Sequence, residues 1–325
     1  MTDRNADIGS PTDKVDLDEL VASADTGGRN PGPIATKVIF GVALAWSLFQ
    51  LWFASPLPFA IGIGVFNDTE ARSIHLAFAI FLAYLAYPAF KNSPRDHIPA
   101  LDIVFAIVGA IAALYLFIFY REISDRVGAP ITQDFVVAII GMLLLLEATR
   151  RALGPALMIV AIVFLVYTFL GPYMPSIIAH KGNSLSEVVN HQWITTEGVF
   201  GIALGVSTSF VFLFVLFGSL LDKAGAGNYF IQVAFSLMGH MRGGPAKAAV
   251  VASGMTGLIS GSSIANVVTT GTFTIPLMKR VGFTAEKSGA VEVASSVNGQ
   301  IMPPVMGAAA FLMVEYVGIP YFDVV

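Results

Sequence analysis

The chain has 325 residues, of which 55% are hydrophobic and 12% charged, about half the charged fraction of roughly 25% usual in soluble domains. This composition argues against a water-soluble globule. The net charge is −4 and no basic stripe is interleaved with aromatic residues, so we expect no nucleic-acid partner. The absence of cysteine excludes disulfides, thiolate nucleophiles and cysteine-ligated metals.

The N-terminal region, residues 1–34, differs from the rest because it is rich in acidic residues, Gly, Pro and Ser. Such a segment cannot bury enough apolar surface to order itself. It also lacks the basic start and apolar stretch of a signal peptide. We therefore expect a disordered, acidic, cytoplasmic tail.

Apolar segments that approach a membrane crossing follow the tail. About 20 apolar residues span roughly 30 Å of hydrocarbon. The segments that meet or approach this length are 35–54, 73–90, 100–120, 134–149, 152–171 and 201–221. Residues 174–199 are too polar to cross, so they predict an extramembrane or interfacial connection. Residues 228–240 are apolar but too short, which predicts an arm lying at the interface.

The positive charges indicate the orientation, because Lys and Arg are retained in cytoplasmic loops. With the N-terminus inside, the outer side receives Arg72, Arg121, Arg126 and Lys181, and the other Lys and Arg residues fall inside. This assignment requires residues 245–280 to enter the membrane and return to the same side. The uncharged run 248–278 fits a re-entrant hairpin of two half-depth helices, because two full crossings need roughly forty residues.

The centre of this hairpin is small and polar: Ser260-Gly261-Ser262-Ser263, followed by Asn266. Irregular backbone at membrane depth survives only where it is buried in protein or lines a wet cavity. Broken helices there present carbonyl ends to a cation and amide ends to an anion. The alternative is that these small residues only allow tight helix packing.

A second break is predicted within 285–317, where Ser295 to Gly307 contains Asn298, Gly299, Gln300 and the tandem prolines Pro303 and Pro304. Prolines remove amide donors and free carbonyls of the preceding turn. A discontinuous helix beside the hairpin would complete a set of oxygen ligands. A plain proline kink is the alternative.

Three acidic residues lie in or near the apolar stretches. Glu147 precedes Arg150 and Arg151 by one turn, which predicts an interfacial ion pair. Glu292 and Glu315 are candidates for ion or proton movement, because ionisable groups within membrane segments are often functional.

The region from Phe212 onward resembles the large permease subunit of TRAP transporters, the tripartite ATP-independent periplasmic transporters. The resemblance lies in Gly243-Gly244, Ile259-Ser260-Gly261-Ser262-Ser263, Ile275-Pro276 with Met278, and Met302-Pro303-Pro304. The preceding helices look like the small four-helix subunit, and this fused layout is similar to the TAXI-type branch.

The resemblance implies an elevator-type symporter in the bacterial inner membrane, driven by Na⁺ and fed by a periplasmic substrate-binding protein that delivers organic anions such as carboxylates. It implies no cofactor besides Na⁺ as coupling ion. The Na⁺ ligands that it implies are Ser260, Gly261, Ser262, Ser263, Asn266, Asn298, Gly299 and Pro303; the substrate ligands are Ser262, Asn266, Asn298 and Gln300. Because the family has two inverted repeats, we also expect that the chain is truncated and that the second repeat is missing.

Together these features predict an all-α polytopic membrane protein, the first half of an inverted-repeat elevator transporter. We expect a tail over 1–34, a small-subunit-like four-helix domain over 35–151, and the N-terminal half of the permease over 152–325. The alternatives are a non-transporting membrane scaffold and an inactive permease fragment. An intramembrane enzyme is disfavoured, because the histidines and carboxylates are too dispersed to form a catalytic group.

Overall fold

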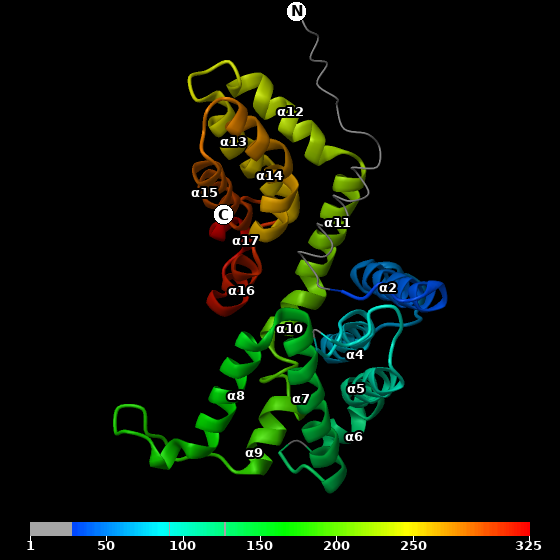
Figure 1. The fold of residues 1–325 in the computed structure, drawn as a ribbon. Coiled ribbons are helices and arrows are strands. Elements are labelled where there is room, and N and C mark those ends of the chain that lie inside the picture. Colours follow the sequence, from blue (N-terminus) through cyan, green and yellow to red (C-terminus); the bar gives the residue numbers. More distant parts are fainter. Residues whose placement is uncertain (1–27, 91, 127) are drawn as a thin grey trace, which may run out of the picture.

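The computed structural model describes residues 28–325 except 91 and 127, and these residues contain helices and loops but no strand (Figure 1). The first part contains α2 (Pro33–Ala54), α3 (Leu57–Ile61), α4 (Asp68–Ala86), α5 (Ala100–Ile118), α6 (Tyr120–Asp125), α7 (Thr132–Leu153), α8 (Pro155–Leu170), η1 (Gly171–Tyr173), α9 (Leu185–Val189) and η2 (Asn190–Ile194). The second contains α10 (Ile202–Val206), η3 (Ser207–Val211), α11 (Phe212–Lys223), α12 (Ala226–Met238), α13 (Gly244–Ser260), α14 (Ser263–Arg280), α15 (Ala285–Ser296), η4 (Val297–Gln300), α16 (Ala308–Val317) and α17 (Tyr321–Val324). The all-α prediction is confirmed.

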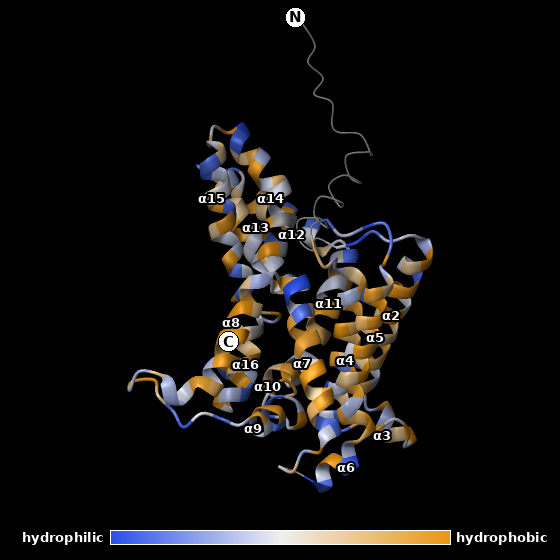
Figure 2. Cartoon of the chain, turned by 60° about the horizontal axis from the view of Figure 1, so that its bottom comes forward, coloured by the Kyte–Doolittle hydropathy of each residue, from blue (hydrophilic) through white to orange (hydrophobic). Residues whose placement is uncertain are grey.

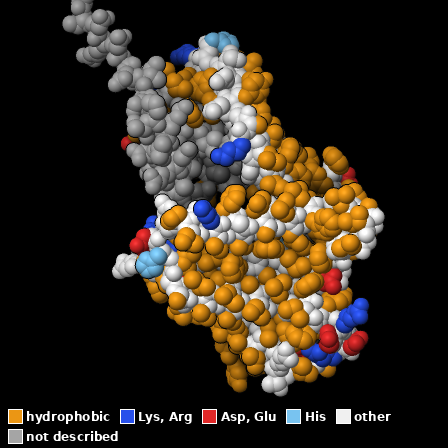
Figure 3. All heavy atoms as spheres, turned by 90° about the vertical axis from the view of Figure 1, so that its right-hand side faces the viewer, with side chains coloured by type: hydrophobic (Ala, Val, Ile, Leu, Met, Phe, Trp, Pro, Cys, Tyr) orange, Lys and Arg blue, Asp and Glu red, His pale blue; other side chains and the backbone are white. Residues whose placement is uncertain are grey.

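Four of the helical segments are long and apolar enough to cross a membrane. They are α2, α5, α8 with η1, and the continuous run of α10, η3 and α11 as far as Leu221. Their surfaces are strongly apolar, and Figure 2 shows α2, α4, α5 and α7 side by side and mostly hydrophobic. The helix α8 has no buried residue. Figure 3 shows hydrophobic side chains covering most of the face where α2 and α5 lie, as expected for a surface that meets lipid.

The core of the first part lies between α4, α5 and α7. Glycine allows these helices to approach closely: a Cβ at Gly109 of α5 would lie 2.6 Å from Ile80 of α4. A Cβ at Gly141 of α7 would lie 2.2 Å from the ring of Trp193, which is fully buried. The indole N–H of Trp193 donates to the Ala112 carbonyl over 3.2 Å. The polar stretch 174–199 is therefore attached to this core through η2, although many residues of the stretch are exposed.

Charged side chains form a buried network where α5 and α7 meet the chain that enters α2. Arg150 and Arg151 bind Glu147 over 2.7 and 2.8 Å, which confirms the predicted ion pair. Arg151 also binds Asp102 over 2.8 Å, and Arg29 contacts the other oxygen of that carboxylate. The network gives these residues the ionic partners that burial demands.

The last residues of the expected tail over 1–34 are packed against the rest of the chain. The Arg29 side chain is fully buried, its backbone N–H donates to the Ala86 carbonyl over 2.7 Å, and Gly32 donates to Asp96 over 3.0 Å. The buried charge of Arg29 is neutralised by Asp102. The part of the predicted tail over 1–27 lies outside the described residues.

A second lobe consists of α12, α13, α14 and α15, and α11 connects it to the rest of the molecule (Figure 1). The helix α12 corresponds to the predicted arm 228–240 and packs on α13, with Ile231, Ala234 and Ala252 buried between them. After the second break the chain returns to η3, where Phe311 of α16 stacks on Phe210 with ring centroids 6.1 Å apart.

Candidate functional site

The predicted hairpin is present as α13 and α14, which lie against each other and are joined at Gly261 and Ser262. Gly261 has φ +60, and a Cβ there would lie 2.5 Å from the Met306 carbonyl oxygen. Only glycine meets both requirements without strain. The hairpin tip therefore contacts the loop of the second break directly.

The arms of the hairpin are longer than the half-depth helices expected from the sequence. They contain 17 and 18 residues, which corresponds to about 26 and 27 Å at 1.5 Å per residue. Half of a hydrocarbon core is only about 15 Å. The sequence predicted two short helices separated by a broad polar turn. In the structure the first helix continues to Ser260 and the second begins at Ser263, so the turn is only two residues long. An inserted hairpin would have to tilt or carry its tip beyond the midplane.

Asn266 lies inside the hairpin and is fully buried. Its Nδ2 donates to the Ser253 carbonyl over 2.9 Å and to the Ser253 hydroxyl over 3.0 Å. Its Oδ1 is buried without a hydrogen-bond partner. A Cβ at Gly299 would lie 2.9 Å from the Asn266 Nδ2, so the hairpin and the second break meet at this side chain. An orphaned acceptor of this kind is available to a cation or a donor.

The second break consists of α15, the short η4 and an irregular loop over 301–307. Two of its carbonyls already accept hydrogen bonds: Asn298 from Met302 over 3.0 Å and Gln300 from Gly307 over 2.7 Å. The Gln300 side chain donates to the Ser263 hydroxyl over 3.1 Å. Pro303 lies half-buried in the loop. The second discontinuous helix beside the hairpin is thus present, rather than a plain kink.

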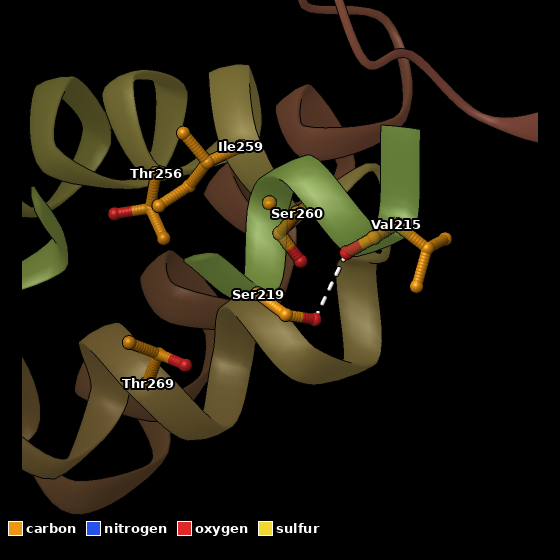
Figure 4. Close-up of a pocket in the computed structure, with 7 residues that line it drawn as sticks. Val215, Ser219, Thr256, Ile259, Ser260 and Thr269 are labelled. Atoms are coloured by element: carbon orange, nitrogen blue, oxygen red, sulfur yellow. Dashed lines mark hydrogen bonds between the residues drawn. The ribbon is translucent and has the colours of Figure 1, made fainter. Parts of the chain in front are cut away.

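A cavity of about 220 Å³ lies between α11 and the two helices of the hairpin (Figure 4). Its lining residues are Val215, Gly218, Ser219, Thr256, Ile259, Ser260 and Thr269. The Ser219 and Thr256 hydroxyls donate to helix carbonyls over 2.9 Å each, and the lining residues that the structure describes include no charged side chain. It has room for water or a small ion, but it supplies no positive side chain to an anion.

The predicted site residues therefore fall into separate groups. Asn266 and Gly299 meet in the buried interior, while Ser263 and Gln300 pair on a more exposed side. Ser260 lines the cavity against α11. The roles of these residues as ligands stay predictions.

Other polar residues at the site were missed by sequence reasoning. Ser253 and Thr256 lie on α13 within an apolar run, and Ser219 lies on α11. A small-residue run was the only signal, and it does not say which side chain faces inward. Gly257 was missed for the same reason, although a Cβ there would lie 2.6 Å from the Gly299 Cα.

The two acidic candidates have different surroundings. Glu292 of α15 is fully buried and contacts the hydroxyls of Thr270 and Thr274 on α14. Glu315 is exposed and lines a cavity of about 280 Å³ that also contains Asp68 and Arg72.

Comparison with known families gives a match over the second part of the chain. Residues 140–325 match the family described as "Tripartite ATP-independent periplasmic transporter, DctM component". This segment is more than half of the chain and contains α8 to α17, the hairpin and the second break.

Curated relatives match over shorter segments. The C4-dicarboxylate TRAP transporter large permease protein DctM of Rhodobacter capsulatus is 34% identical over 91 residues, which cover 28% of this chain and 21% of that protein. The ectoine TRAP transporter large permease protein TeaC of Halomonas elongata is 28% identical over 95 residues, covering 29% and 22%. The chain spans about a fifth of the length of these relatives. No solved structure matches it significantly.

Proposed function

Because the chain belongs to the DctM component family of tripartite ATP-independent periplasmic transporters, we propose that it acts as the membrane permease component of a sodium-coupled secondary transporter. The named relatives are permeases rather than enzymes, and the apolar helices make the chain a multi-pass inner-membrane protein. A periplasmic substrate-binding protein would deliver the substrate. The substrate would be an organic anion such as a carboxylate, because one of the relatives is named for C4-dicarboxylates.

The observation that carries sodium coupling is the buried, unpartnered Oδ1 of Asn266. Uncharged oxygen atoms suit a hard monovalent cation. Ser260, Ser262 and Ser263 supply hydroxyls and carbonyls at the turn before Asn266, and the broken helix supplies Asn298 and Gly299. Because these residues lie in separate groups around the tip, they would have to close around a bound ion. We assign these oxygen atoms as the Na⁺ ligands, with Ser262, Asn298 and Gln300 also available to the substrate.

The arrangement of the two lobes supports alternating access by displacement of the hairpin. Helices α2, α4, α5 and α7 would form the fixed scaffold, and α12 to α15 the moving unit. The fused first part would take the place of the small subunit, as in the TAXI-type branch. In this proposal the N-terminus is cytoplasmic, and the open end of the hairpin, with Lys247 and Lys279, faces the same side.

Uptake into proteoliposomes tests this function. The product of the gene, reconstituted with its binding protein, is expected to accumulate a radiolabelled carboxylate only under an inward Na⁺ gradient. Asn266→Ala should reduce the initial rate at least about tenfold, because removal of a ligand oxygen weakens ion binding by more than about 1.4 kcal/mol. Ser236→Ala is the matched control, since Ser236 is exposed on α12 and bonds only within its own helix.

Two outcomes would contradict the proposal. Uptake indifferent to Na⁺ and to Asn266→Ala would remove the symporter assignment. A folded, inserted protein without any uptake in the presence of its binding protein would favour the alternatives, a membrane scaffold or an inactive permease fragment.

A further inference from the structure

Glu292 lies between α14 and α15. It is fully buried, and Gly271 of α14 leaves room for it: a Cβ there would lie 3.2 Å from the Glu292 Cγ. Its two carboxyl oxygens contact different hydroxyls, Oε1 that of Thr270 and Oε2 that of Thr274. The two threonines are one helical turn apart, so they face the carboxyl group together.

No basic side chain neutralises this carboxyl group among the described ion pairs. The elements packed against Glu292 are α13, α14 and η4. The charged residues on these elements and on α15 itself are all exposed near the open end of the hairpin: Lys247, Lys279, Arg280, Glu286 and Lys287. An ionised carboxylate buried without a partner is strongly unfavourable, and such a group becomes neutral instead.

The hydrogen atoms at the cluster can be counted. The Thr270 hydroxyl also lies 2.8 Å from the Asn266 carbonyl, and the Thr274 hydroxyl 3.0 Å from the Thr270 carbonyl. Each hydroxyl has one hydrogen, and carbonyls and carboxylates only accept. If both hydroxyls donate their hydrogen to the helix carbonyls, they have only lone pairs left to present to Glu292, and an ionised carboxylate would meet two acceptors and no donor. A proton on the carboxyl group supplies a missing donor.

We propose that Glu292 is a proton-binding site: its protonated carboxyl group, held by Thr270 and Thr274, joins the second arm of the hairpin to α15. Release of the proton would leave an ionised carboxylate against hydroxyls already bonded to helix carbonyls. The contact between α14 and α15 would then loosen. The site itself is independent of sodium coupling, but its use in transport rests on the proposed function.

Infrared spectroscopy of the reconstituted protein tests the site without requiring transport. A protonated carboxylic acid has a C=O stretching band separate from that of a carboxylate. We expect this band at neutral pH in the unaltered protein and expect Glu292→Gln to remove it. Glu315→Gln, which changes an exposed acid, should leave it in place. Identical acid bands in the unaltered protein and a folded Glu292→Gln variant would overturn the proposal.

A second pair of variants keeps the test decisive if Glu292→Gln fails to fold. Thr270→Val with Thr274→Val retains the acid but removes both hydroxyl partners, so the band should shift to higher frequency. Thr272→Val is the matched control on the same helix, because its hydroxyl bonds to the Thr269 carbonyl instead. A band that does not move would show that the acid lies elsewhere. Loss of the band on addition of Na⁺ at constant pH would overturn the proposal in favour of a cation site.

Discussion

The Asp102 carboxylate holds together two segments that are far apart in the sequence, the chain just before α2 and the end of α7. It accepts from Arg29 before α2 and from Arg151 at the end of α7, and its side chain is 6% exposed. The two arginines are themselves 0% and 3% exposed. Removing one partner from such a buried group costs more than an exposed ion pair contributes, because the remaining charges stay desolvated.

Asp102→Asn is therefore expected to destabilise the protein by about 3 kcal/mol, because two buried arginines lose their shared negative charge. Thermal unfolding in detergent, followed by circular dichroism, measures this effect. Asp68→Asn is the control, because the Asp68 side chain is 80% exposed and 3.7 Å from Arg72. A change below about 1 kcal/mol is expected there. Equal effects of the two substitutions would contradict the importance of burial.

Single residues also show the limits of sequence reasoning. The ion pair of Glu147 was predictable, because its partners lie one turn away on the same helix. The partners of Glu292 and Asn266 were not, because Thr270 and Ser253 reach them across helix pairs. The sequence shows which residues lie one turn apart on the same helix. It does not show which faces of two neighbouring helices pack together.

Among the elements, the hairpin depends most on small residues. Gly257 of α13 packs on Gly299 of η4, where a Cβ would lie 2.6 Å from the Gly299 Cα. Gly254, one turn earlier on α13, is also buried, but a Cβ there would meet no atom within 4 Å. Substituting alanine at each position therefore distinguishes two effects: the loss of close helix packing, expected only at Gly257, and the general gain in helix propensity, expected at both.

Gly257→Ala is expected to destabilise the hairpin by about 1–3 kcal/mol, because the added methyl group forces the break away from α13. Gly254→Ala should be neutral or stabilising by up to about 1 kcal/mol, because alanine favours helix. Thermal unfolding of the two variants under the same conditions gives the comparison. A Gly257→Ala variant as stable as Gly254→Ala would mean that α13 and η4 do not pack as described.

The long elements were predictable and the short ones were not. Apolar length located α2, α5, α8 and the continuous run of α10, η3 and α11 to within a few residues, and tandem prolines located the second break. The outer ends of the hairpin were predicted, but the inner ends of α13 and α14 were missed because Ser260 and Ser263, which are poor formers of isolated helices, are helical here under tertiary packing. The π-helical η3 left no pattern that a regular periodicity could reveal.

For the whole molecule, the central question is whether both ends of the hairpin lie on one side of the bilayer. The helices α13 and α14 lie against each other as the arms of a hairpin, which places Lys247 and Lys279 at the same end. The chain has no cysteine, so introduced cysteines can be labelled without background.

Lys247→Cys and Lys279→Cys should both react with a membrane-impermeant maleimide from the cytoplasmic side, measured in inverted and right-side-out vesicles. Lys181→Cys, in the polar connection after η1, is the control that should react from the opposite side. Labelling of positions 247 and 279 from different sides would contradict a hairpin that returns to the face it left. Labelling of position 181 from the cytoplasm would reverse the orientation instead.

The crossing of α11 and α13 restricts how the molecule can bend. A Cβ at Gly218 would lie 2.0 Å from the Ile259 carbonyl oxygen, so the two backbones are nearly in contact. Neither helix can slide past the other without a clash, so in the proposed displacement α11 would move together with α13. A hinge for this displacement would then lie before Gly218 in the chain. The π-helical turn Ser207–Val211 is a suitable position, because the regular α-helical hydrogen bonds are interrupted there.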